Sequence, residues 1–243
     1  MCFYLIFNSL QKKRILFLIF FCFLVKLEAE NSRDNNGTYY NLTKALQNPL
    51  DVLALELYDS QLTTLPKEIE QLQNLESLRL DGENLTTLPQ EIGQLQRLKE
   101  LSLDNNQLTA LPKEIGRLQN LQKINLSSNR LVTLPQEIGK LQSLKELYLE
   151  KNQLTTLPKE IGKLKKLKNL YICDNQLTIL PKKIGKLQKL EYLNLSNNQL
   201  TTLPKEIRKL QNLHFLGLEG MPALISQKNK IEILFPNLRQ PQD

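Results

Sequence analysis

The chain has 243 residues, of which 41% are hydrophobic, and a formal net charge of +7 at pH 7. This length can hold one or two domains with a sizeable core, but a single histidine and no tryptophan are unusual for an enzyme of this size. Without the first 29 residues, 28 Lys and Arg face 24 Asp and Glu, which leaves a net charge of +4. That surplus is too mild to favour a nucleic-acid partner.

The first 29 residues have the composition of a signal peptide. Basic residues at 12–14 precede an unbroken apolar run at 15–25, and Ala29 offers a small residue for cleavage. The run is shorter than the roughly 20 apolar residues of a membrane-spanning helix. We therefore expect export with cleavage after residue 29; the alternative is an uncleaved interfacial or signal-anchor helix. Lipid attachment at Cys22 is disfavoured because bulky Phe20 and Phe21 precede it.

A short helix is expected next, in an N-terminal helical cap that spans residues 30–51. Residues 40–47 form an amphipathic pattern, and the Asn48-Pro49 step ends it before the first repeat.

Residues 52–212 consist of seven copies of a 23-residue repeat. The copies follow the template L-x-x-L-x-L-x-x-N-x-L-x-x-L-P-x-x-I-x-x-L-x-x, and their prolines recur at the same spacing: Pro66, Pro89, Pro112, Pro135, Pro158, Pro181 and Pro204. Period and pattern are those of a leucine-rich repeat. No copy can bury its leucines alone, so stacked copies must share one continuous core.

Each template position has a physical role. Leu101 and Leu103 are two residues apart, so both point from a short strand into the core, while Ser102 points outward. Asn106 stands where the chain leaves the strand, and its buried amide can pair with backbone groups of adjacent coils. Gly116, in the recurrent Glu-Ile-Gly tripeptide, is expected to hold a turn at positive φ.

Residues 213–243 are predicted to be a partial eighth repeat followed by a C-terminal helical cap. Leu213 opens one more strand, and Ser226 can cap a helix that runs to Phe235 and stops at Pro236.

These residues resemble a known family. The phrases LTTLPKEIGKLQ and LSNNQLTTLP, with the lead-in LTKALQNPLDV, are similar to the 23-residue leucine-rich-repeat proteins of leptospires. The resemblance implies an α/β-type repeat solenoid, a horseshoe with a parallel concave β-sheet and short irregular or 3-10 convex segments. It also implies an exported protein that meets host surfaces, without fixed binding residues. Ser60, Glu83 and Met221 replace the template asparagine, so the asparagine ladder is expected to be irregular near both ends.

The outward positions of the strands form three columns on the concave face. Since neighbouring strands lie about 4.8 Å apart, we expect one contiguous aromatic strip of Tyr148, Tyr171, Tyr192 and Phe215. Aromatic side chains with a polar group are favoured at protein interfaces. They are also good strand formers that stack along a sheet, and both interpretations stay open.

Charge is segregated between the faces. The concave face is expected to bind a basic partner through an acidic field beside Tyr58, formed by Glu56, Asp81, Glu100, Asp104, Glu146 and Glu150. Calcium binding is disfavoured because no loop clusters its ligands. The convex lysines are interpreted as a solvated face, with adsorption to anionic lipid or polysaccharide as the alternative; they are Lys159, Lys163, Lys165, Lys166, Lys182, Lys183, Lys186 and Lys189.

No catalytic arrangement is apparent. His214 has no serine or cysteine motif around it. Cys173 is interpreted as a small strand residue; the less favoured alternative is a reactive thiol. Phosphate-loop, zinc and nucleophile-elbow motifs are absent from the sequence. The 31 residues after the last full repeat are too few for a catalytic domain.

We therefore predict a non-enzymatic, monomeric binding protein without cofactor or metal. Its expected partner is a protein, such as a host surface or matrix protein, and its expected location is secreted or at the cell surface, or alternatively periplasmic. Membrane contact is expected only through the transient signal segment. The competing hypothesis is a cytoplasmic scaffold that resembles the Ras-group repeat proteins.

Overall fold

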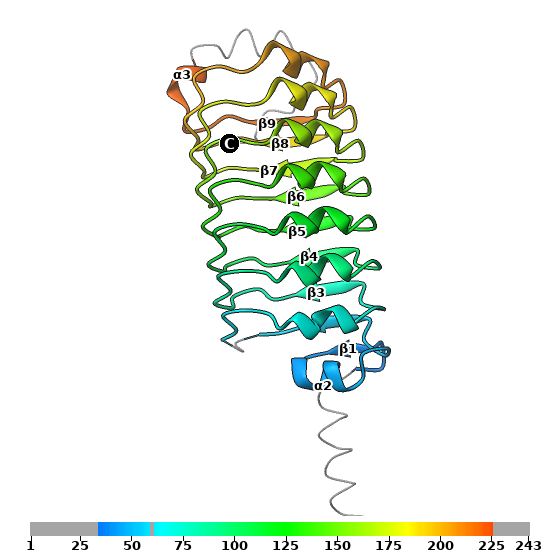
Figure 1. The fold of residues 1–243 in the computed structure, drawn as a ribbon. Helices are drawn as coiled ribbons and strands as arrows, with labels where there is room; N and C mark the ends of the chain where they lie inside the picture. The colour runs from blue at the N-terminus through cyan, green and yellow to red at the C-terminus, as the bar shows by residue number, and fades with distance from the viewer. Residues whose placement is uncertain (1–33, 59–60, 226–243) are drawn as a thin grey trace, which may run out of the picture.

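Each 23-residue repeat forms one coil of a solenoid, in which a short strand is followed by a return segment with a 3-10 helix (Figure 1). The computed structural model describes residues 34–58 and 61–225. The predicted signal peptide, Ser60 and the predicted C-terminal helix at 226–235 lie outside this range.

Nine parallel strands form one sheet in chain order. They are β1 Thr38–Tyr39, β2 Ala54–Glu56, β3 Ser77–Arg79, β4 Glu100–Ser102, β5 Lys123–Asn125, β6 Glu146–Tyr148, β7 Asn169–Tyr171, β8 Tyr192–Asn194 and β9 Phe215–Gly217. The sheet is the predicted concave face. The opposite, convex face carries the 3-10 helices η1 Lys67–Gln71, η2 Gln90–Gln94, η3 Lys113–Arg117, η4 Gln136–Lys140, η5 Lys159–Lys163, η6 Lys182–Lys186 and η7 Lys205–Lys209. The predicted solenoid class is confirmed.

One hydrophobic core runs the length of the solenoid, from Tyr39 to Leu224. As predicted, Leu101 and Leu103 are fully buried within it. Stacking therefore supplies what a single coil lacks, because each leucine row is covered by the row of the next coil.

The predicted asparagine ladder is present. Asn152 is buried; its Oδ1 accepts from Leu131 N–H at 3.0 Å, and its Nδ2 donates to Leu126 O of the preceding coil at 2.9 Å. Asn106, Asn129, Asn175 and Asn198 repeat this pattern. Near the N-terminal end, the carboxylate of buried Glu83 takes over the acceptor role and receives Leu62 N–H at 3.0 Å.

The role predicted for the repeat glycines is wrong. Gly116 and its equivalents do not have positive φ. Instead, a Cβ at Gly116 would lie only 2.6 Å from the carbonyl oxygen of Glu137 on the next coil. Glycine is required because adjacent 3-10 helices approach too closely for a side chain. The residue directly before each ladder asparagine has positive φ instead, for example Asn105 with φ 54°.

The N-terminal cap contains a helix and an additional strand. Helix α2 spans Leu42–Gln47 and so begins two residues after the predicted start at Tyr40, because Asn41 is its N-cap and accepts Lys44 N–H at 3.0 Å. Strand β1, which the repeat pattern did not predict, pairs with β2 and extends the sheet by one strand. At the other end, α3 spans Pro222–Ile225.

Candidate functional site

The outward positions of the strands lie in the predicted register. Parallel pairing places Glu100 beside Lys123 and Lys123 beside Glu146 in the first column, and Tyr148 beside Tyr171 in the second. The third column lies just beyond the strand ends. Because every coil has the same length, the columns run straight along the concave face.

The four predicted aromatic residues form two stacked pairs. The rings of Tyr148 and Tyr171 are parallel, with centroids 5.0 Å apart, and those of Tyr192 and Phe215 are 6.3 Å apart. Tyr148 and Tyr171 occupy the second column, whereas Tyr192 and Phe215 occupy the first, so the pairs are offset across the sheet. Tyr192 is exposed and the other three rings are half-buried.

The hydroxyl groups of the first pair are held as neutral donors. Burial raises the pKa of Tyr148 well above its ordinary range, and the hydrogen bond to Glu146 at 2.8 Å adds to this effect. Burial, with the negative charge of Glu150, also raises the pKa of Tyr171. Both phenols therefore offer a partner an apolar ring with a protonated hydroxyl at its edge.

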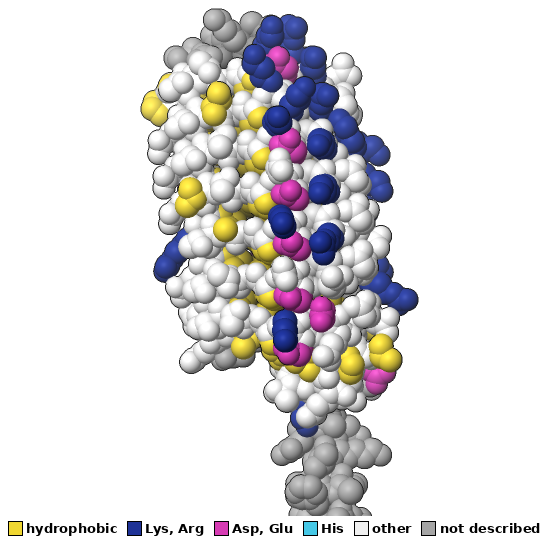
Figure 2. All heavy atoms as spheres, viewed as in Figure 1, with side chains coloured by type: hydrophobic (Ala, Val, Ile, Leu, Met, Phe, Trp, Pro, Cys, Tyr) yellow, Lys and Arg dark blue, Asp and Glu magenta, His cyan; other side chains and the backbone are white. Residues whose placement is uncertain are grey.

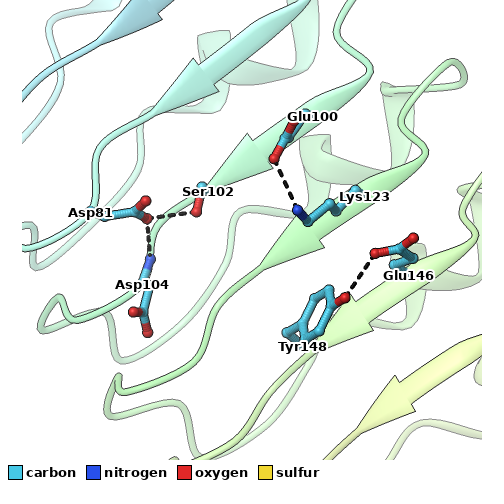
Figure 3. Close-up of polar contacts among 7 residues, drawn as sticks. All are labelled: Asp81, Glu100, Ser102, Asp104, Lys123, Glu146 and Tyr148. Atoms are coloured by element: carbon cyan, nitrogen blue, oxygen red, sulfur yellow. Dashed lines mark hydrogen bonds and ion pairs between the residues drawn. The ribbon is translucent and has the colours of Figure 1, made fainter. Parts of the chain in front are cut away.

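The acidic residues of the concave face are engaged with neighbouring coils (Figure 3). Asp81 accepts from Ser102 Oγ at 2.6 Å and from Asp104 N–H at 2.8 Å, and Glu100 pairs with Lys123 at 3.2 Å. In the same way, Glu150 accepts from Ser127 Oγ at 2.5 Å. These contacts bury Ser102, although it is on the outward side of its strand.

The N-terminal part of the face has mixed charge. Tyr58 is 56% exposed and donates to Glu56 at 2.7 Å. Arg79 lies beside Glu56 on the next strand, within the predicted acidic stretch. Positive charges thus interrupt that stretch twice, at Arg79 and at Lys123.

Lys123 is the residue that the sequence-based selection missed. Its Nζ pairs with Glu100 and also lies 5.9 Å from the centroid of the Tyr148 ring. The alternation Glu100, Lys123, Glu146 within one column was the available signal. Lys123 therefore links the acidic stretch to the first aromatic pair.

A shallow hollow of about 300 Å³ lies at the edge where strands β4, β5 and β6 begin. Every residue that lines it has a charged or amide side chain: Lys99, Glu100, Gln122, Lys123, Lys145 and Glu146. Small-molecule sites are mostly apolar with a few polar groups. The hollow therefore does not have the character of a cofactor or substrate pocket.

Cys173 and His214 are not placed to act together. Cys173 follows the end of β7, whereas His214 precedes the start of β9, so they lie at opposite ends of strands separated by β8. Burial, and secondly the Asp174 carboxylate, raise the pKa of the Cys173 thiol to about 12. Among the described residues, no group of three or more His, Cys, Asp or Glu could hold a metal ion.

Parallel strands in chain order, 3-10 helices on the opposite face and a buried asparagine ladder define a leucine-rich-repeat solenoid. The chain belongs to the leucine-rich-repeat family: residues 6–129, 97–177 and 124–192 match the leucine-rich repeat region, and residues 165–221 match the leucine rich repeat. A search of curated proteins finds no match.

Three solved structures are similar. A leucine-rich-repeat protein of Leptospira interrogans is 41% identical with a TM-score of 0.59, over 83% of this chain and 62% of that one. The ectodomain of a membrane receptor kinase of Arabidopsis thaliana, in complex with Casparian strip integrity factor 2, is 31% identical with a TM-score of 0.66, over 74% of this chain and 22% of that one. An internalin of Listeria monocytogenes shares the fold at 22% identity with a TM-score of 0.61, over 79% of this chain and 56% of that one.

This chain thus spans less than two thirds of each of these relatives. The repeats and these neighbours indicate a protein–protein interaction module. Proteins with this fold are typically non-enzymatic. In residues 34–58 and 61–225, no helix is long and apolar enough to cross a membrane.

Proposed function

We propose that this chain is an exported leucine-rich-repeat protein of the leptospiral 23-residue type that binds a protein partner through its concave face. The observation that carries the proposal is the presence of two stacked aromatic pairs, Tyr148 with Tyr171 and Tyr192 with Phe215, on a rigid sheet. Interface hot spots are enriched in such aromatic anchors.

The chemistry around these pairs favours a partner with apolar and basic side chains. The rings supply apolar area at a low cost in side-chain entropy, because stacking already fixes them. Glu146 and Glu150 lie beside the first pair. Carboxylates at the rim of an apolar contact steer a basic partner and set its orientation.

The proposed location of the protein and the proposed class of its partner are supported by observations other than the aromatic pairs. The basic residues at 12–14 and the apolar run at 15–25 favour export, and the plant neighbour is an ectodomain. We infer a secreted or cell-surface monomer whose partner is a host or cell-surface protein. We also infer that the protein is not an enzyme, because Cys173 and His214 lie at opposite ends of strands separated by β8 and cannot act as a catalytic pair.

Replacing all four aromatic residues by alanine tests the binding surface. A pull-down from host-surface extracts should recover a specific partner with the parent protein and not with this variant. The matched control is Val132→Ala with Ile179→Ala, which removes side chains 48% and 62% exposed away from the strands. Partner recovery that survives the aromatic replacement, with unchanged thermal melting, would show that the pairs only stack along the sheet.

Processing of the N-terminus tests export separately. We expect N-terminal sequencing to find a protein that begins near Glu30 outside the cytoplasm. A cytosolic protein with residues 1–29 intact would instead favour the scaffold hypothesis.

A further inference from the structure

A row of five basic residues crosses the convex face, far from the aromatic pairs. Each 3-10 helix from η3 to η7 ends in a basic residue at the same template position: Arg117, Lys140, Lys163, Lys186 and Lys209. We call these five residues the basic row. All are exposed. Coils stack about 4.8 Å apart at the sheet, so the row is about 19 Å long.

The residues of the basic row form no ion pair within the described part of the chain. The ion pairs within the described part of the chain join Glu76 to Lys99, Glu100 to Lys123 and Lys168 to Glu191, and none involves the row. Like charges held at this spacing repel one another, which is unfavourable unless an anion lies along them. The row is therefore not explained as a set of structural ion pairs.

The charge increases toward the C-terminal end. Residues 159–209 hold 12 Lys and Arg against 4 Asp and Glu, a net charge of +8, whereas residues 52–158 hold 11 against 14, a net charge of −3. A column of half-buried glutamates flanks the row, but in η6 Lys183 replaces the glutamate. Figure 2 shows the corresponding column of basic side chains beside the acidic column, with more basic side chains near the C-terminal end.

The coils hold the row at a fixed spacing. A Cβ on the glycine next to each of the first four row residues would clash with the next coil, as Gly116 does at 2.6 Å from Glu137 O. The 3-10 helices of successive coils are therefore packed closely, backbone against backbone. A straight, preorganised array of cations fits an extended polymer that carries anions at regular intervals.

Two other anionic surfaces fit less well. A bilayer is favoured by apolar side chains that enter it, but the exposed large hydrophobic residues of the described chain lie outside the 3-10 helices of this face. Single-stranded nucleic acid is favoured by aromatic platforms for its bases, and the five helices η3, η4, η5, η6 and η7 themselves contain no aromatic residue. We propose that the basic row and the lysines around it bind a linear anionic polysaccharide, through its sulfate or carboxylate groups.

The probe for the test is a fluorescently labelled dextran sulfate fragment, with neutral dextran of equal length as its control. Fluorescence anisotropy in 0.15 M salt measures the Kd. The row variant is Lys140→Gln with Lys163→Gln and Lys186→Gln. The matched variant is Lys67→Gln with Arg97→Gln and Arg130→Gln. It also removes three positive charges, but at exposed positions outside the row.

We expect the row variant to raise the Kd about 10-fold or more and to reduce its salt dependence, because three anion contacts are lost. The matched variant should change it by less than about 3-fold, since it alters only the overall field. The aromatic quadruple variant should bind dextran sulfate as the parent does, which separates this surface from the concave face. Circular dichroism melting confirms that each variant is folded.

Three results would overturn the proposal. They are an equal loss of affinity in both charge variants, no binding of dextran sulfate at 0.15 M salt, and tighter row-dependent binding to phosphatidylserine vesicles or to a single-stranded oligonucleotide than to dextran sulfate.

Discussion

Replacing Asn152 by alanine tests whether the asparagine ladder holds the coils together. The substitution leaves the N–H of fully buried Leu131 without its side-chain partner, whereas Leu126 O keeps a hydrogen bond from Asn129 Nδ2 at 3.1 Å. A buried backbone group without a hydrogen bond costs about 1–3 kcal/mol, so the free energy of unfolding should fall by about 1–3 kcal/mol. Urea unfolding followed by far-UV circular dichroism measures the change.

Asn120→Ala is the matched control for this experiment. Asn120 is exposed and donates one hydrogen bond, to Gln96 O at 2.8 Å, so its loss should lower the free energy of unfolding by only about 0.5–1.5 kcal/mol. If Asn152→Ala is no more destabilising than Asn120→Ala, water or local rearrangement satisfies the backbone groups. The ladder would then not be the element that joins the coils.

Three further predictions concern other template and core positions. Gly116→Ala should lower the free energy of unfolding by about 1–3 kcal/mol in thermal melts, because the new Cβ meets Glu137 O. Glu83→Asn should raise it by about 1 kcal/mol in urea, since an amide can accept from Leu62 N–H and also donate, whereas a carboxylate only accepts. The Cys173 thiol, with its pKa near 12, should react with iodoacetamide at pH 8 at least 10-fold more slowly in the folded than in the urea-unfolded protein. Its raised pKa means that the folded state holds the proton more tightly, so its contribution to stability is present below the ordinary value of about 8.5 and declines as pH rises toward 12.

Each of these has a control and a contrary outcome. Arg117→Ala changes an exposed residue next to Gly116 and should leave the melting temperature nearly unchanged; an equal effect at both positions would contradict the close-approach argument. Glu91→Asn, at a half-buried position outside the ladder, should not stabilise the protein. A destabilised Glu83→Asn variant would show that the carboxylate suits its site better than an amide. Equal labelling rates for folded and unfolded protein would contradict the protection of Cys173.

The repeat made most of the fold predictable. Fixed spacing assigns the template leucines and ladder asparagines to the core without knowledge of any contact, and Leu101, Leu103 and Asn106 are buried as expected. The prediction was wrong for Gly116 because a glycine in a sequence can mark either a positive φ or a close approach that leaves no room for a side chain. Only the short distance to Glu137 on the next coil shows that the second reason applies. Strand β1 was missed because Thr38–Tyr39 carries no leucine pattern, although its pairing with β2 extends the sheet.

The candidate site was predictable only in part. Column register follows from constant coil length, so the pairing of Tyr148 with Tyr171 could be inferred from numbering alone. The offset of the second pair also follows from numbering, but whether rings in different columns touch depends on side-chain rotamers. The same holds for the charges. A list of acidic residues suggested a uniform field, whereas Lys123 reaches both Glu100 and the Tyr148 ring.

The architecture would allow the two proposed binding surfaces to coexist on one small scaffold. The fold fixes the residue type at the positions of the template leucines, ladder asparagines and repeat glycines. It does not fix the residue type at the outward strand positions or at the ends of the 3-10 helices. A substitution at Tyr148 alters the concave face without moving the coil, and a substitution at Lys163 alters the basic row in the same coil region. Because a continuous core lies between them, the two proposed surfaces could acquire partners independently, and a protein partner on the sheet would leave the convex face free for an anionic polymer.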